Sequence, residues 1–124
     1  MKQQTFSPSS NHPERALQAW QILISAAHNR QTHTYLNLSR IMYGKDAAGV
    51  LDKILGHIAF FCDDYGLPPL TTIVVGKGRG TPGDDIPVER KDMDRLREEV
   101  YAENWYDIYP PTTTQLAKAF AKQR

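Results

Sequence analysis

The first half of the chain contains three segments in which apolar residues recur at steps of three and four, the spacing that places them on one face of a helix. The first segment runs from Pro13 to about Asn29, and proline suits a first helical turn because its missing N–H would be unpaired there anyway. Its apolar positions are Ala16, Leu17, Trp20, Leu23, Ile24 and Ala27. Three successive segments of this kind predict a mostly helical domain with one shared core.

The second and third helices are predicted to lie on either side of a tight turn at Gly44. Thr34 is placed to cap the second helix, and glycine is the usual residue just after a helix end. The second helix turns Tyr35, Leu38, Ile41 and Met42 inward. The third begins near Asp46 and carries an apolar stripe of Val50, Leu51, Ile54, Leu55, Ile58, Phe61 and Cys62.

The helical pattern stops at Gly66-Leu67-Pro68-Pro69, since two prolines cannot continue a helix. The β-branched run 70–75 is typical of a strand, and a glycine-rich, partly basic loop follows over 76–85. Residues 87–104 predict a charged amphipathic helix, 105–111 an aromatic connector, and Thr112 or Thr113 the cap of a last helix. Residues 1–10 are expected to form a flexible tail before a single domain at 11–124.

This order, three helices followed by a strand and a glycine-rich loop, is that of a winged helix-turn-helix. The expected fold class is therefore α+β and mostly helical. Residues 11–86 would form the winged-helix-like core with a short β-hairpin as its wing, and 87–124 would add two C-terminal helices.

Charge is distributed unevenly although the net charge is only +1. Residues 1–62 carry six positive and three negative side chains, whereas 63–124 carry nine positive and eleven negative. The N-terminal half is thus the better candidate for contact with phosphate. No apolar run approaches the ~18 residues of a membrane span. The single cysteine and the polar N-terminus favour a cytoplasmic protein.

The segment Arg30-Gln31-Thr32-His33-Thr34-Tyr35-Leu36-Asn37-Leu38 resembles the start of the helix-turn-helix in the alkylguanine-DNA alkyltransferases and their non-enzymatic alkyltransferase-like relatives. In that family a Thr or Ser and a Tyr stand at the start of the second helix. Leu67-Pro68-Pro69-Leu70-Thr71-Thr72-Ile73-Val74-Val75, with its glycine loop, resembles the family's Pro-Cys-His-Arg-Val-Val strand and wing. The resemblance covers about residues 15–83.

The resemblance implies DNA contact rather than alkyl transfer. Tyr35 matches the family's tyrosine that presses on a DNA phosphate, while Leu70 stands at the nucleophilic cysteine or its tryptophan replacement. Thr71 and Thr72 replace the histidine and arginine, so the base that would activate a thiolate is missing. The segment 46–50 lacks the arginine that fills the gap left by a flipped base.

The leading hypothesis is accordingly a non-enzymatic, DNA-binding protein of regulatory or repair-associated type that contacts duplex backbone. The residues expected to meet phosphates are Tyr35, Arg40, Lys45, Lys53, Lys77 and Arg79. The alternative is a protein-interaction module, such as a small immunity or adaptor protein, that uses the acidic and aromatic C-terminal half. Its binding residues would be Trp105, Tyr106 and Tyr109, because Trp and Tyr dominate interface hot spots.

The sequence gives little support to a nucleotide site, a zinc site or a reactive cysteine, and no cofactor, metal or catalytic residue is expected. Gly78-Arg79-Gly80-Thr81-Pro82-Gly83 matches G-x-G-x-x-G but does not open a βαβ unit, as a dinucleotide site requires. The histidines give no zinc spacing. Cys62 lies on an apolar stripe, where a buried thiol is the plain interpretation.

Overall fold

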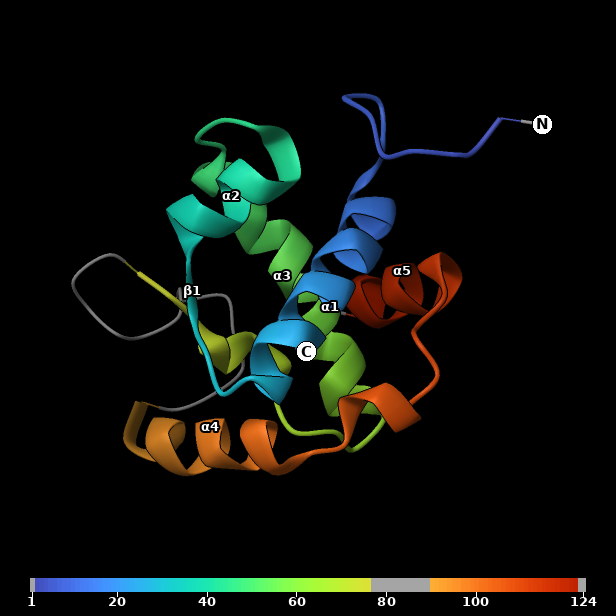
Figure 1. Ribbon diagram of the computed structural model, residues 1–124. Coiled ribbons are helices and arrows are strands. Elements are labelled where there is room, and N and C mark those ends of the chain that lie inside the picture. The colour runs from blue at the N-terminus through green and yellow to red at the C-terminus, as the bar shows by residue number, and fades with distance from the viewer. Residues whose placement is uncertain (1, 77–89, 123–124) are drawn as a thin grey trace.

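The computed structural model describes residues 2–76 and 90–122 (Figure 1). Their first half contains α1 His12–His28, β1 His33–Thr34, α2 Tyr35–Tyr43 and α3 Ala48–Asp64. Then follow the 3-10 helix η1 Leu70–Ile73, β2 Val74–Val75, η2 Arg90–Asp92, α4 Met93–Ala102, η3 Trp105–Asp107 and α5 Thr113–Lys122. The expected mostly helical α+β fold is confirmed at this level.

The helix ends form where the sequence predicts them. Asn11 and Glu14 form a reciprocal capping box before α1, which has proline in its first turn. The Thr34 side chain accepts a hydrogen bond from the Asn37 N–H at the start of α2. Gly44 ends α2 with φ +72°, a left-handed conformation that glycine adopts without strain. Each cap supplies a partner for backbone groups that a helix end leaves unpaired.

The expected strand 70–75 is wrong over most of its length. Leu70–Ile73 form η1, and only Val74–Val75 are extended. β2 pairs in parallel with β1, with His33 opposite Val74. The pairing involves only two residues of each strand. The other residues of the expected strand, Leu70–Ile73, are all buried in η1. The expected wing lies outside the described residues, and the helix expected over 87–104 is described as η2 and α4.

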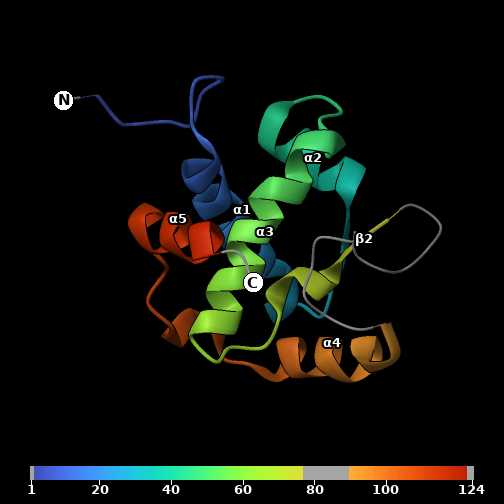
Figure 2. The same ribbon diagram turned by 180° about the vertical axis from the view of Figure 1, so that it is seen from behind.

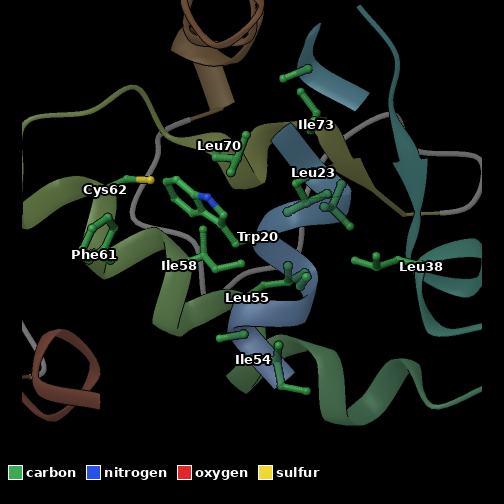
Figure 3. Close-up of a cluster of buried hydrophobic side chains, with 14 of the residues drawn as sticks. Trp20, Leu23, Leu38, Ile54, Leu55, Ile58, Phe61, Cys62, Leu70 and Ile73 are labelled. Atoms are coloured by element: carbon green, nitrogen blue, oxygen red, sulfur yellow. The ribbon is translucent and has the colours of Figure 1, made fainter. Parts of the chain in front are cut away.

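The core surrounds α3, which packs against both α1 and α5 (Figures 1 and 2). Trp20 of α1 lies at the centre of the buried cluster, close to Ile58 of α3 and Leu70 of η1 (Figure 3). Its ring meets those of Phe61 and Trp105 edge-on, at centroid distances of 5.7 and 5.6 Å. Aromatic rings favour this perpendicular arrangement.

The middle of α3 is enclosed. Every residue from Ile54 to Ala59 is buried, whereas Gly49, Val50 and Lys53 in its first turns are exposed. A helix that reads a DNA groove must present a free face. Only the N-terminal part of the expected recognition helix meets that condition.

His57 makes part of the α3–α5 contact. Its ring stacks on Phe120 at 4.1 Å, lies edge-on to His12, and its Nδ1 is 2.7 Å from the Lys53 carbonyl oxygen. Because a carbonyl only accepts, Nδ1 carries the proton of the neutral ring. Burial lowers the pKa of His57 below its ordinary value of 6.5, an effect that the Lys53 hydrogen bond opposes and the nearby His12 reinforces.

The free energy of unfolding is therefore expected to fall as the pH drops below about 6.5. In that range His57 binds a proton more readily in the unfolded chain than in the folded one. Burial lowers the pKa of His33 as well, and it contributes in the same direction. Urea unfolding at several pH values between 7.5 and 5 measures the slope. His57→Gln should flatten it, because it removes a group whose pKa is lowered by burial. A slope unchanged by His57→Gln would contradict the assignment.

Candidate functional site

The turn between α2 and α3 is held by a buried serine. Ser39 is fully buried, and its hydroxyl donates to the Lys45 carbonyl at 2.8 Å while accepting from the Ala47 N–H. The Gly44 N–H donates to the Arg40 carbonyl. These bonds tie both sides of the turn to the last part of α2, so the residues of the turn have a defined position.

Three of the expected phosphate-binding side chains lie around this turn. Arg40 on α2, Lys45 in the turn and Lys53 on α3 are exposed, and none makes an ion pair with the described residues. Tyr35 is half-buried at the start of α2 against β1. Lys77 and Arg79 lie outside the described residues.

Two residues expected to point inward are instead exposed beside these cations. Ile41 is 51% exposed and Val50 is 41% exposed. The apolar spacing predicted both helices correctly, but Ile41 and Val50 lie on parts of α2 and α3 that the core does not cover. The surface formed by Arg40, Ile41, Lys45, Val50 and Lys53 is called here the basic turn.

Acidic residues gather at the opposite end of the molecule, on α4 (Figures 1 and 2). There Arg30 bonds Glu98 at 2.6 Å, and Arg95 pairs with both Asp92 and Glu99. Arg30 and Arg95 are therefore engaged with carboxylates, and Arg97 donates to the Thr72 carbonyl. The acidic helix is thus separate from the basic turn, where Asp46 and Asp52 are the carboxylates in the same stretch of chain, 40–53.

A buried arginine near the basic turn escaped the sequence analysis. Arg15 of α1 is only 5% exposed. Its Nη1 donates to the Met42 carbonyl and the Gln18 side chain, its Nη2 donates to the Ser7 carbonyl, and its guanidinium lies 4.2 Å from the centre of the Tyr43 ring. Arg15 thus joins the N-terminal segment to the end of α2.

A cleft of about 750 Å³ opens beside this arginine. Its wall comes from the N-terminal segment, α1, the end of α2 and the first residues of α3, and it includes Arg15, Tyr43 and Lys45. Burial raises the pKa of Tyr43, an effect that the Arg15 charge opposes. A sequence signal existed, since Arg15 shares a helical stripe with the buried residues Ala19 and Ala26.

The aromatic residues of the alternative hypothesis divide into two groups. Trp105 is a core residue whose indole N–H donates to the Val100 carbonyl at 2.7 Å, so it offers a partner no freely exposed ring. Tyr106 and Tyr109 are 57% and 91% exposed. A groove of about 360 Å³ lies beside them, lined by Trp20, Trp105 and Pro110 among others. Within the described residues, the buried indole N–H of Trp20 has no acceptor.

Cys62 is buried next to Trp20 (Figure 3). Burial raises the pKa of its thiol to about 12, so the thiol remains protonated at neutral pH. We expect no reaction with Ellman's reagent in the folded protein at pH 7.5 and one equivalent of thiol after unfolding in guanidinium chloride. Rapid labelling of the folded protein would show that the core opens at this position.

The described residues offer the candidate site neither a membrane-spanning helix nor a metal-binding cluster. Within the described ranges, no helix is long and apolar enough to cross a membrane. Over the same residues, no cluster of three or more His, Cys, Asp or Glu side chains is arranged to hold a metal ion. Comparison of the chain with protein-family models, with curated proteins and with solved structures finds no match.

Proposed function

We propose that this protein binds duplex DNA without catalysing a reaction on it, in a regulatory or repair-associated role, and that the basic turn meets the phosphate backbone. The observation that supports this most is the group of three exposed cations, Arg40, Lys45 and Lys53, without ion-pair partners among the described residues. Backbone binding depends on such cations because each neutralised phosphate releases counterions.

The arrangement of the helices supports the same surface. In helix-turn-helix proteins the residues at the N-terminus of the recognition helix approach the base edges, while neighbouring residues contact phosphates. The first turns of α3 are the part of that helix left exposed, and they lie between Lys45 and Lys53. Ile41 and Val50 add apolar surface, which suits the methyl group of thymine. Tyr35, Lys77 and Arg79 remain proposed contacts on the strength of the resemblance.

The test is fluorescence anisotropy of a labelled duplex at about 50 mM and about 200 mM salt, with Arg40→Gln/Lys53→Gln as the variant. Each phosphate contact contributes ~0.9 to the slope of log affinity against log salt, so losing two should lower the slope by about 2. Between these salt concentrations the loss of affinity should then be about tenfold smaller than in the wild type.

The matched control is Lys118→Gln/Lys122→Gln on α5, which removes the same charge from another surface. It should leave the salt slope nearly unchanged. Equal effects of the two double variants would mean that net charge alone attracts DNA. Absence of binding at the lower salt concentration would refute the proposal for the isolated protein.

A protein partner at the aromatic groove is the second candidate function. It is favoured by the exposure of Tyr106 and Tyr109 beside an aromatic-lined groove of about 360 Å³. Tyr106→Ala/Tyr109→Ala should abolish a complex isolated with the wild-type chain and leave the circular dichroism spectrum unchanged. A complex that survives this double variant would contradict binding at the groove.

A further inference from the structure

Arg15 carries a buried positive charge. Three of its five N–H donors have acceptors, and each acceptor is a neutral oxygen. The Nε–H has no partner among the described residues, and Arg15 makes no ion pair with them. Arginine is almost never this deeply buried unless paired, because removing a charge from water is costly.

The adjoining cleft has the size and lining of a small-molecule site. Its volume of about 750 Å³ falls within the ~300–1,000 Å³ typical of ligand pockets. Met42, Tyr43 and Val50 supply apolar wall, and Lys45 adds a second cation. Asp46 is the one negative side chain of the lining.

We propose that this cleft binds a small organic molecule that carries a phosphate group. Arg15 on α1 and Lys45 in the turn after α2 both line the cleft. A phosphate has enough oxygens to accept hydrogen bonds from both side chains. The apolar body of the ligand packs on Tyr43 and Val50. A phosphate would also give Arg15 an anionic acceptor in addition to its three neutral ones. The inference does not require DNA binding, although Lys45 also belongs to the basic turn.

A purely structural role for Arg15 accounts for only part of the geometry. Its bonds to Ser7 and Met42 hold the N-terminal segment against the C-terminal end of α2, where a cation is favourable. Such a tether explains two of the three hydrogen bonds of Arg15. It does not explain why a second cation and an open cleft lie beside an arginine whose Nε–H has no acceptor among the described residues.

The test is a titration with phenyl phosphate followed by ¹H–¹⁵N NMR of the backbone amides and the Arg15 Nε–H. We expect saturable shifts of the Arg15, Tyr43 and Ala47 signals. Benzyl alcohol, which has the ring without the charge, should cause none, and benzoate and inorganic phosphate should bind more weakly. Absence of shifts, equal binding of benzyl alcohol, or tighter binding of benzoate would overturn the proposal.

Three variants locate the site. Lys45→Gln should weaken phenyl phosphate binding several-fold, and Asp46→Asn should strengthen it by removing the negative charge. Arg15→Lys keeps the charge but loses the planar fork, so binding should weaken; if this variant fails to fold, the Lys45 and Asp46 variants still decide the outcome. Unchanged affinity in both of those variants would refute the assignment.

The same titration separates this site from the proposed DNA surface. Arg40→Gln/Lys53→Gln should lose salt-sensitive DNA binding and retain phenyl phosphate binding, because neither residue lines the cleft. Arg15→Lys, where it folds, should bind phenyl phosphate more weakly and retain salt-sensitive DNA binding. If both variants lose both ligands together, the cleft is part of the DNA surface and not an independent site, which would contradict this proposal.

Discussion

Replacement of Trp20 by alanine is expected to lower the free energy of unfolding by ~3–5 kcal/mol, the usual cost of truncating a large buried aromatic side chain. Trp20 is 1% exposed and is in edge-on contact with Phe61 of α3 and Trp105 of η3. Its removal leaves a cavity where α1, α3 and the C-terminal segment meet. Because domains of this kind are stable by only ~5–15 kcal/mol, the loss is a large fraction of the total.

Trp20→Phe is the matched control. It keeps a ring in the same place and removes an indole N–H that has no acceptor within the described residues, so its cost should be less than half that of Trp20→Ala. Urea unfolding monitored by the fluorescence of Trp105, the remaining tryptophan, measures both variants. Equal costs would mean that the ring contacts contribute little and that the loss arises elsewhere.

The helices were predictable because their signals are local. Apolar spacing, the Thr34 cap and the Gly44 end depend on residues within a few positions of each other, and these features are present where expected. The β1–β2 pairing was not predictable, since residues 33–34 carry no strand pattern and nothing local to 74–75 indicates so distant a partner. The η1 segment was predicted as a strand because its residues have strand propensity, which tertiary packing overrides in the folded chain.

The candidate site was predictable only in part. Arg40, Lys45 and Lys53 could be proposed from charge, and their position around one turn follows from the helix-turn-helix order. Arg15 was overlooked because a charged residue in the first turn of a helix is normally solvated. Its burial depends on Ser7 and Met42, which approach it from two other parts of the chain. Such convergence is a property of the folded molecule. The helical stripe that Arg15 shares with Ala19 and Ala26 indicates its inward-facing side but not these partners.

The contact between α3 and α5 depends on a glycine, and Gly56→Val is expected to weaken it by ~1–3 kcal/mol, the usual cost of overpacking a core. A Cβ at Gly56 would lie 3.0 Å from Cε1 of Phe120. Phe120 is half-buried, but it is stacked on His57 and lies near Phe60, so it cannot move without disturbing these contacts. Chemical denaturation of the variant measures the change.

Phe120→Leu in the same chain should relieve part of the cost, giving a coupling energy of at least ~0.5 kcal/mol in a double-mutant cycle. Displacement of Phe120 also uncovers His57, so the pKa of His57 should rise toward its ordinary value of 6.5 in Gly56→Val, as an NMR titration of the ring would show. Additive effects of the two substitutions, together with an unchanged His57 titration, would mean that the valine is accommodated without moving α5. The lost stability would then come from the interior of α3 itself.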